Sequence, residues 1–383
     1  MQYFDHNATT PLSEAAREAW LEAIERFPGN PSSPHRMGSR ADRALTDARE
    51  AVANWLGIAS GDVVWTSGAT EASNMVFAHY SRLLSFDDVV WVSAIEHPCV
   101  LQAARHFLGP RVREIPVDQE GCVATAWLDE ALQDQRPSLV VVMAANNETG
   151  VLQDWKQVLA WCQENSIPYF CDAAQWIGKL PVGGLGQCDW LMGCAHKFGG
   201  PKGVGFLKCP SKGAFHSLMV GGPQEMARRP GTENVAGVLS MVAAWEERER
   251  LLSPLWIDEQ VALRRSIEEV LLDRVPGTQI LGRSDNKLWN TLAAVMPDCD
   301  CRFRWVVKLD REGFAVSTGS ACASGKEEPS HVLGAMGYRA DEASRVIRCS
   351  SGPETTRRDW EGLLGAFERV GQEASGGGGM PVS

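Results

Sequence analysis

Cys322 lies in the stretch STGSACASGKEEPSHVL, residues 317 to 333, which consists mainly of small, polar and charged residues. A structural cysteine is usually packed among apolar neighbours, and this one has almost none within four residues on either side. The composition predicts a mobile, solvent-exposed loop. A thiol in such a loop is suited to act as a nucleophile that reaches a partner, although an inert exposed thiol explains this segment equally well.

Lys197 is the second residue with a potential chemical role. It follows the apolar run DWLMGC, lies beside His196 and precedes a Gly-Gly-Pro turn. A lysine at the end of a buried strand has its pKa lowered by desolvation, which frees the amine for Schiff-base chemistry. A lysine in a surface loop is an equally good interpretation of this motif alone.

A small turn follows the predicted strand DVVWT and runs directly into a helix, in the sequence SGATEASN. The free backbone N–H groups at such a helix start, here near Ala69 and Thr70, form a candidate phosphate site. A Ser or Thr placed before a Glu is also ordinary helix capping, and this pattern alone favours capping.

Three further strands end in polar residues. His97 follows VVWVS, Asn147 and Glu148 follow VVVMAA, and Asp172 and Gln175 follow PYFC. A lone histidine is more often structural than catalytic, and turn formation explains one asparagine easily. A carboxylate at the end of an apolar strand is costly unless it meets a positively charged partner.

Together these residue types match the requirements of one cofactor, pyridoxal 5′-phosphate (PLP). Lys197 would form the Schiff base, and Asp172 would hold the pyridine nitrogen protonated so that the ring acts as an electron sink. His97 would stack on the ring and move protons. The combination, rather than any single motif, predicts a PLP site.

The elements that must position these residues alternate along the chain. Segments such as 155–166 are expected to be helices, and short apolar runs are expected to be buried strands, at 89–93, 139–145, 168–172, 189–193 and 203–207. This alternation predicts an α/β domain with a mostly parallel sheet. In such sheets ligands bind beyond the C-terminal ends of the strands, which is where the polar residues lie.

A long amphipathic helix is predicted over residues 38–57. Its apolar residues recur at three- and four-residue steps, at Ala41, Leu45, Ala48, Val52 and Trp55. Ser39 is expected to cap its start, and Gly57 is expected to end it.

Two domains are expected from a chain of 383 residues. The large domain is predicted over 14–250. The small α+β domain is predicted to combine 1–13 with 251–374, with strands in LWNTLAAVMP and FAVSTG, and a flexible, glycine-rich tail at 375–383.

Composition excludes several classes of function. The net charge of −11 argues against a direct nucleic-acid partner, which requires a basic face, and against anionic membrane surfaces. No signal peptide or membrane-spanning run is visible, so a cytoplasmic protein is expected. The eleven cysteines are scattered without a CxxC pair, which argues against a disulfide framework or a structural zinc site.

The chain resembles the cysteine desulfurases, PLP enzymes of the class V aminotransferase fold. The resemblance runs in order from residue 3 to about residue 352 and is closest to the branch with a long catalytic loop, which serves iron–sulfur cluster assembly. It is carried by YFDHNATTP, GNPSSPH, TSGATEASN, EHPCV, NNETGV, DAAQWIGK, AHKFGGPKGVG, RRPGTENVAG and STGSACASGKEEPSHVL. It implies fold type I, with a mostly parallel, seven-stranded sheet and a smaller C-terminal domain.

The resemblance also implies a role for each matching residue. Lys197 corresponds to the PLP-binding lysine, His97 to the ring-stacking acid–base group, and Cys322 to the nucleophile. Arg348 and Asn147 correspond to contacts with the substrate carboxylate, and Arg348 suits that task as a bidentate group. The other cofactor contacts are Ala69, Thr70, Asp172, Gln175, Cys194, His196 and Thr232.

In the family, sulfur leaves L-cysteine, L-alanine is released, and a persulfide remains on the cysteine that Cys322 matches. The persulfide is then passed to an acceptor for iron–sulfur clusters or other thio-cofactors, so Cys322 would meet a metal only transiently, through an iron–sulfur partner. Thr232 matches a threonine that reaches the phosphate across a dimer interface, which implies a homodimer.

Three departures from the family pattern are visible. Cys194 stands where a serine or threonine usually contacts the phosphate, and a thiol is a weak donor. Pro223 and Pro230 are expected to stiffen the segment that carries Thr232. The short, glycine-rich C-terminus leaves docking of a scaffold protein in doubt.

Two other functions remain open at this point. A selenocysteine lyase, or another PLP enzyme of the same fold, would retain Lys197 and differ in substrate. A cysteine-rich iron–sulfur or redox-sensing module would not depend on Lys197, but the sequence has no clustered ligand spacing to support it.

Overall fold

A seven-stranded sheet forms the centre of the larger part of the molecule. The computed structural model describes residues 1–211, 215–282, 285–298, 304–318 and 330–376. The strands lie in the order β2 (Val63–Thr66), β8 (Gly205–Lys208), β7 (Trp190–Cys194), β6 (Tyr169–Asp172), β5 (Pro137–Val141), β3 (Val89–Ser93) and β4 (Val112–Ile115). All pairs from β7 to β4 are parallel, and β8 is antiparallel to both neighbours. The predicted mostly parallel sheet is therefore confirmed.

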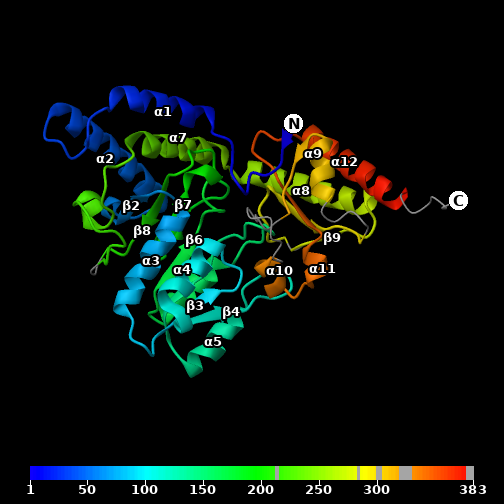
Figure 1. Cartoon of the computed structure of the whole chain (residues 1–383), viewed down its shortest axis with the longest axis horizontal. Coiled ribbons are helices and arrows are strands. Elements are labelled where there is room, and N and C mark those ends of the chain that lie inside the picture. Colours follow the sequence, from blue (N-terminus) through cyan, green and yellow to red (C-terminus); the bar gives the residue numbers. More distant parts are fainter. Residues whose placement is uncertain (212–214, 283–284, 299–303, 319–329, 377–383) are drawn as a thin grey trace.

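Helices cover both faces of this sheet (Figure 1). One face packs against α3 (Ala69–Leu83) and α4 (Pro98–Leu108). The other packs against α1 (Glu14–Arg26), α2 (Arg36–Leu56), α5 (Thr125–Asp134), α6 (Trp155–Glu164) and α7 (Val235–Leu251). Because side chains alternate along a strand, Phe206 of β8 points into the second layer and Leu207 into the first. This two-sided burial explains why the strands appear in the sequence as continuous apolar runs.

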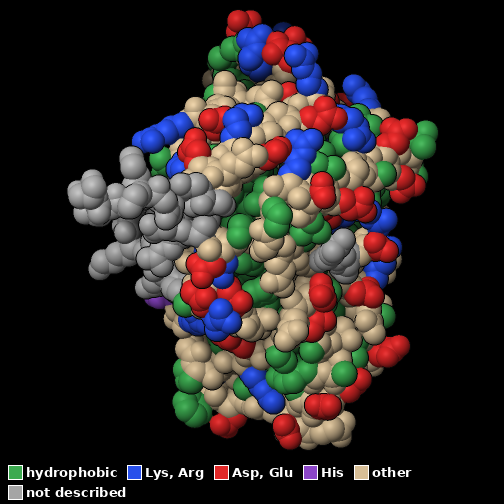
Figure 2. Space-filling view, turned by 90° about the vertical axis from the view of Figure 1, so that its right-hand side faces the viewer, with side chains coloured by type: hydrophobic (Ala, Val, Ile, Leu, Met, Phe, Trp, Pro, Cys, Tyr) green, Lys and Arg blue, Asp and Glu red, His purple; other side chains and the backbone are tan. Residues whose placement is uncertain are grey.

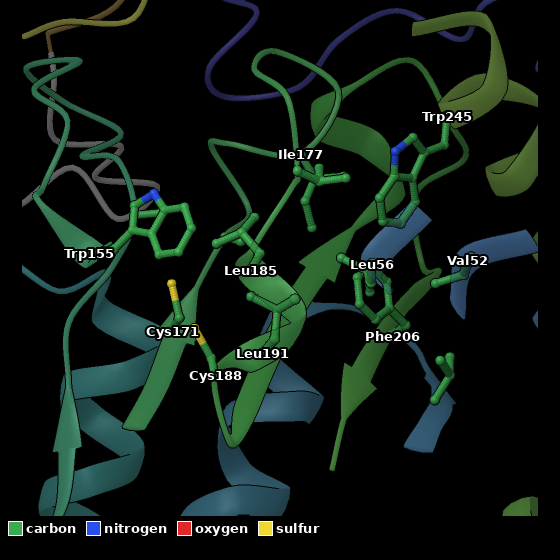
Figure 3. Packing of buried hydrophobic residues seen from close by; sticks show 14 of the residues in the cluster. Val52, Leu56, Trp155, Cys171, Ile177, Leu185, Cys188, Leu191, Phe206 and Trp245 are labelled. Carbon is green, nitrogen blue, oxygen red and sulfur yellow. The ribbon is translucent and has the colours of Figure 1, made fainter. Parts of the chain in front are cut away.

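The second layer is dense with aromatic rings (Figure 3). Trp245 of α7 lies over Phe206, with ring centroids 5.5 Å apart, and Val52 and Leu56 of α2 complete this part of the core. Cys171 and Cys188 are buried in the same layer as ordinary apolar fillers.

The helix predicted over 38–57 is α2, and its apolar residues face the core as expected. Gly57 ends it with a φ of +66°, as predicted. The prediction that Ser39 caps this helix is wrong. The helix begins at Arg36 and its N-cap is His35, four residues before Ser39, because the Nδ1 atom of His35 accepts a hydrogen bond from Gly38 N at 3.2 Å. Histidine is not among the usual capping residues, so the sequence signal was weak.

Two strands differ from the prediction by more than one residue at a boundary. β5 ends at Val141 rather than at residue 145, although Ala145 forms an isolated bridge with Leu152. β8 begins at Gly205 because Gly203, with a φ of +76°, is left-handed and cannot continue a strand.

The rest of the chain forms a smaller α+β unit beside the large sheet. Helix α8 (Pro254–Arg274) leads into an antiparallel sheet of β9 (Gln279–Ile280), β10 (Thr291–Val295) and β12 (Val346–Ser350). The N-terminal strand β1 (Gln2–Tyr3) pairs with β11 (Phe314–Ala315). The remaining helices are α9 (Arg304–Arg311), α10 (His331–Ala335), α11 (Ala340–Ala343) and α12 (Arg357–Gly376).

This unit has a core of its own, in which the rings of Phe4 and Trp360 lie 4.7 Å apart. The N-terminus therefore packs with the C-terminal part of the chain, as the division at 1–13 and 251–374 predicts. The exact domain boundaries stay a prediction, and most of the predicted tail, residues 377–383, lies outside the described residues.

A strained turn lies between β8 and α7. Glu225, Met226 and Ala227 are consecutive left-handed residues, with φ of +50°, +57° and +61°. None of them is glycine, so the turn has an energetic cost that its surroundings must offset. The Glu225 carboxylate is buried, pairs with Arg49 at 2.7 Å and accepts a hydrogen bond from Trp65 N at 3.0 Å. These contacts hold the turn against the edge of the sheet.

Candidate active site

A cavity of about 520 Å³ lies at the C-terminal edge of the parallel strands. Ten of the predicted site residues line it, namely Ala69, Thr70, His97, Asn147, Asp172, Gln175, Cys194, His196, Lys197 and Arg348. The first nine lie at the ends of strands of the large sheet or in the segments that follow them, and Arg348 comes from β12 of the smaller unit. The fold therefore gathers into one cavity residues that are spread over 280 positions of the chain.

Lys197 lies in a short turn directly after β7. Its Nζ atom donates hydrogen bonds to the backbone carbonyls of Asn7, at 2.6 Å, and Ala8, at 3.0 Å. Burial lowers the pKa of this amine, and the charge of Arg348 lowers it further, whereas Cys194 opposes the shift. A lysine with a lowered pKa has more of its amine in the nucleophilic, uncharged form.

Asp172 is a buried carboxylic acid, 4% exposed, at the last position of β6. Burial raises its pKa to about 6, although a hydrogen bond from Ala174 N and the charge of Lys197 limit the rise. Within the described part of the chain, no cationic side chain forms an ion pair with it. The site thus holds a carboxyl group that a protonated ring nitrogen would stabilise as the anion, so the residues present fit PLP.

The start of α3 forms one wall of the cavity. Gly68, with a φ of +143°, precedes the helix, and the Glu71 carboxylate accepts a hydrogen bond from Ser67 N at 2.6 Å. Capping therefore explains part of this motif. Arg229 pairs with Glu71 at 2.8 Å, which offsets the negative charge of Glu71 near the helix start. A helix N-terminus whose carboxylate is already paired remains suited to an anion.

Cys194 lies against this helix start. Burial raises the pKa of its thiol to about 11, and the backbone N–H of Ala69 donates a hydrogen bond to its sulfur, which lowers the pKa in part. The thiol acts here as an acceptor and stays protonated. It is therefore a component of the cavity wall and a poor nucleophile.

His97 caps α4. Its Nδ1 atom accepts a hydrogen bond from Cys99 N at 3.1 Å, so the neutral ring carries its proton on Nε2. Burial lowers the pKa of His97 to about 4, and the charges of Lys197 and His331 contribute. The ring is therefore neutral at physiological pH, and proton transfer without loss of the cap has to run through Nε2.

Arg348 is 2% exposed, and its guanidinium is held by Asp5 and Asn147 among the described residues. It pairs with Asp5 at 2.6 Å and donates to the carbonyl oxygen of Asn147 at 2.9 Å. The backbone of Ser317 pairs with that of Arg348 in both directions, at 3.0 and 2.8 Å. The strand that carries the arginine thereby also anchors the described residues that precede the Cys322 segment.

Two predicted residues are not among those that line the cavity. Cys322 lies outside the described residues. Ser330 is the first described residue after Cys322, and its Oγ donates a hydrogen bond to the buried Glu148 carboxylate at 2.5 Å. Thr232 is exposed and does not line the cavity of its own chain. Its predicted contact, with the phosphate in a second subunit, stays a prediction.

Sequence reasoning missed two residues of the site. Asn7 lines the cavity and binds Lys197, but it reaches this place only because β1 pairs with β11. Glu96 is fully buried beside His97. One of its oxygens accepts from Met143 N at 2.6 Å, while the other has no hydrogen-bond partner among the described residues. An acidic residue within the apolar context of AIEHPCV was a signal for Glu96.

Buried histidines make the cofactor-free protein sensitive to acid. Burial lowers the pKa of His6, His79, His97 and His196 to about 4. In the unfolded chain these histidines have a pKa of about 6.5, so unfolding takes up protons when the pH lies between the folded and the unfolded pKa values. Their contribution to stability is therefore complete above about pH 6.5 and is lost as the pH falls toward 4. Asp172, with its pKa raised to about 6, acts in the opposite direction.

We expect the melting temperature to fall as the pH is lowered from 7 to 4.5, because four histidines outweigh Asp172 and Glu96. Differential scanning calorimetry measures this. His79→Gln should make this fall in melting temperature less steep, because burial disfavours the charged form of His79 in the folded protein. His79 also does not line the cavity. The exposed His106 provides the control, and His106→Gln should leave the slope unchanged. A melting temperature that rises over this range would contradict the expectation.

The sheet, the cavity at its C-terminal edge, and the lysine, aspartate and histidine within it define the fold type I class of PLP-dependent enzymes. The model of the class-V aminotransferases matches residues 2–363. The chain is 35% identical to "Cysteine desulfurase IscS" of Dictyoglomus turgidum, over 96% of this chain and 94% of that protein. A NifS-like protein from Rickettsia africae superposes with a TM-score of 0.86 at 29% identity, over 97% of this chain and 99% of that one. A structure described as SspA in complex with cysteine superposes with a TM-score of 0.80 at 28% identity, over 93% and 100%.

The chain therefore belongs to the class-V aminotransferase family, and within it to the cysteine desulfurases. This confirms the resemblance seen in the sequence. The family implies dependence on PLP, and its named relatives imply L-cysteine as the substrate. None of the helices in the described part of the chain is long and apolar enough to span a membrane.

Proposed function

We propose that this protein removes sulfur from L-cysteine, with PLP bound at Lys197 and with Cys322 as the sulfur-accepting thiol. The observation that carries the proposal is the convergence of Lys197, Asp172, His97 and Arg348 on one cavity of about 520 Å³. A cavity of this size, with few and well-placed polar groups, is typical of a site for a cofactor and a small substrate.

The cofactor would lie between α3 and β12. Asp172 would pair with the ring nitrogen, Gln175 would meet the ring hydroxyl, and His97 would stack on the ring. The N-terminus of α3, with Ala69 and Thr70, would hold the phosphate together with Cys194 and His196. When bound, PLP supplies an electron sink for the electrons released at the substrate Cα.

Lys197 and Arg348 would act on the substrate. Arg348 is a buried cation at the cavity wall, and with Asn147 it would bind the carboxylate of cysteine. The amine of Lys197, with its lowered pKa, would take the proton from Cα. His97 would exchange a proton with the substrate thiol through Nε2, because its Nδ1 is engaged by Cys99 N.

Sulfur transfer requires a nucleophilic thiolate. The thiolate of Cys322 would attack the substrate sulfur, so that an S–S bond forms while the C–S bond breaks. The electron pair of the broken bond stays on the substrate carbon, which takes up a proton and leaves as alanine. The two thiols that line the cavity are poor candidates, because burial raises the pKa of Cys99 to about 12 and that of Cys194 to about 11.

Two partners are part of this proposal. A second copy of the chain would receive Thr232 at its phosphate site, which agrees with the exposure of this threonine outside its own cavity. A sulfur-acceptor protein, such as an iron–sulfur scaffold, would remove the persulfide sulfur from Cys322. The net charge of −11 favours an acceptor with a basic docking face. On the face seen in Figure 2, however, acidic and basic side chains are interspersed.

The proposal is tested by product analysis. With PLP, L-cysteine and a reducing thiol, the purified protein should release alanine and sulfide in equal amounts. The same assay with L-selenocysteine separates the alternatives, because a selenocysteine lyase would leave cysteine nearly untouched. Absence of alanine from cysteine, in a protein that has bound PLP, would overturn the proposal.

A further inference from the structure

Lys179 is a buried lysine to which the mechanism above gives no task. It lies in the turn after β6 and is 3% exposed. No carboxylate in the described part of the chain forms an ion pair with it. Its Nζ atom instead donates to two side-chain carbonyl oxygens, Asn7 Oδ1 at 2.7 Å and Gln175 Oε1. Burying an amine with only neutral partners costs free energy, so the two hydrogen bonds that Lys179 makes call for an explanation.

The contact with Lys179 determines which way the Gln175 amide faces. The amine offers N–H donors, so the amide atom beside it is the oxygen. On the other side of the amide, Nε2 donates to the backbone carbonyl of Asn7 at 2.9 Å, and that carbonyl can only accept. A rotated amide would lose both hydrogen bonds. The nitrogen of Gln175 is therefore held on the side of Asn7 O, which Lys197 Nζ also contacts.

Asn7 is itself fixed independently of Gln175. Its Oδ1 atom also accepts from Asn290 Nδ2 at 3.2 Å, and its Nδ2 atom donates to Thr291 Oγ1 at 2.9 Å. Lys179 thus donates to the fixed amide of Asn7 on one side and to the amide of Gln175 on the other. Both Asn7 and Gln175 line the cavity, whereas Lys179 is not among the residues that line it.

Lys179 can donate both hydrogen bonds in either protonation state. Burial lowers the pKa of this amine, and the charges of Lys197 and Arg348 lower it further. A neutral amine still has two N–H groups, which suffice for the two carbonyl oxygens. The two hydrogen bonds from Lys179 can therefore form whether or not its amine carries the extra proton.

We propose that Lys179 is a positioning residue of the cofactor site. By holding Gln175 Oε1, it keeps Gln175 Nε2 turned toward the cavity, so that the site offers an N–H donor to the anionic ring oxygen of PLP. This inference rests on the proposed function and adds a residue that acts through Gln175 rather than on the cofactor.

The test is the visible absorbance of the PLP-loaded protein, titrated between pH 6 and 10. A donor that favours an anionic oxygen lowers its basicity, so loss of the donor raises the pH midpoint of the absorbance change. We expect Lys179→Met to raise this midpoint by about one pH unit and to weaken PLP binding about ten-fold, since one hydrogen bond to a charged group is lost. An unchanged midpoint in Lys179→Met would overturn the inference.

Lys208 provides a matched control. It is also buried, at 7% exposed, and also donates to two carbonyl oxygens, those of Cys188 at 2.6 Å and Asp189 at 3.1 Å. It does not line the cavity or contact Gln175. Lys208→Met should therefore cost stability without moving the midpoint.

A double-variant cycle shows whether Lys179 acts through Gln175. Gln175→Met alone should raise the midpoint, and adding Lys179→Met should raise it no further. A second, independent shift would overturn the inference. If Lys179→Met does not fold, Lys179→Gln retains an N–H donor and should shift the midpoint less than Gln175→Met, and an equal shift would contradict the inference. A wild-type protein that binds no PLP would instead overturn the proposed function.

Discussion

Replacing Lys197 by alanine is expected to reduce cysteine turnover at least about a thousand-fold, the scale on which loss of a covalent catalytic group acts. The amine is the group that the fold prepares for Schiff-base chemistry, because burial lowers its pKa and the carbonyls of Asn7 and Ala8 hold it at the cavity wall. The variant should also lose the visible absorbance of bound PLP on dialysis. Alanine production and the absorption spectrum measure the two effects.

Lys202 is the control for this experiment. It also lines the cavity but is exposed, so it lacks the desolvation that activates Lys197. Lys202→Ala should lose less than about ten-fold, in line with the small effect of exposed charges. Full turnover in Lys197→Ala, with Lys202→Ala unaffected, would show that another group holds the cofactor.

The Cys322→Ser variant is expected to lose persulfide formation and at least about a hundred-fold of turnover, because a hydroxyl cannot take the sulfur atom as a thiolate does. It should still bind PLP and still respond spectroscopically to cysteine. The substitution leaves every described residue that lines the cavity unchanged. Mass spectrometry of the protein after reaction with cysteine detects the sulfur adduct on Cys322 in the wild type and its absence in the variant.

Cys122 serves as the control for this test, and Cys99 is the competing thiol. Cys122 is half-buried and does not line the cavity, so Cys122→Ser should behave as the wild type. Cys99 is the cavity thiol whose pKa burial raises to about 12. Full turnover in Cys322→Ser, with a sulfur adduct on Cys99, would contradict the proposed route and would show that a buried thiol can compete.

The residues that carry the chemistry were predictable because each follows a strand that is legible in the sequence. His97, Asp172 and Lys197 all come directly after continuous apolar runs, and parallel strands place their C-terminal ends along one edge of a sheet. Local sequence and global fold agree at these positions. The same agreement made the end of α2 at Gly57 predictable, because the left-handed conformation there favours glycine.

The rest of the site depends on contacts between distant segments, which no local pattern reports. Asn7 meets Lys197 and Lys179 only because the N-terminus pairs with β11, and Asp5 meets Arg348 across the same junction. The cap of α2 by His35 was missed for a different reason, since it depends on a ring nitrogen that propensity scales do not reward. Long-range register and an unusual hydrogen-bond acceptor at the helix cap therefore lay beyond sequence reasoning.

The ion pair between Asp5 and Arg348 joins residues from opposite ends of the chain, and this has a consequence for biogenesis. During synthesis on the ribosome, the segment around Lys197 and Asp172 can already fold, because its strands follow one another along the chain. The wall formed by Asn7 and Arg348 has to wait until Val346–Ser350 has emerged and the first residues have paired beside it. The proposed site for the substrate carboxylate is therefore completed only late in synthesis. A nascent chain arrested before β12 contains the reactive amine but lacks the arginine that faces it.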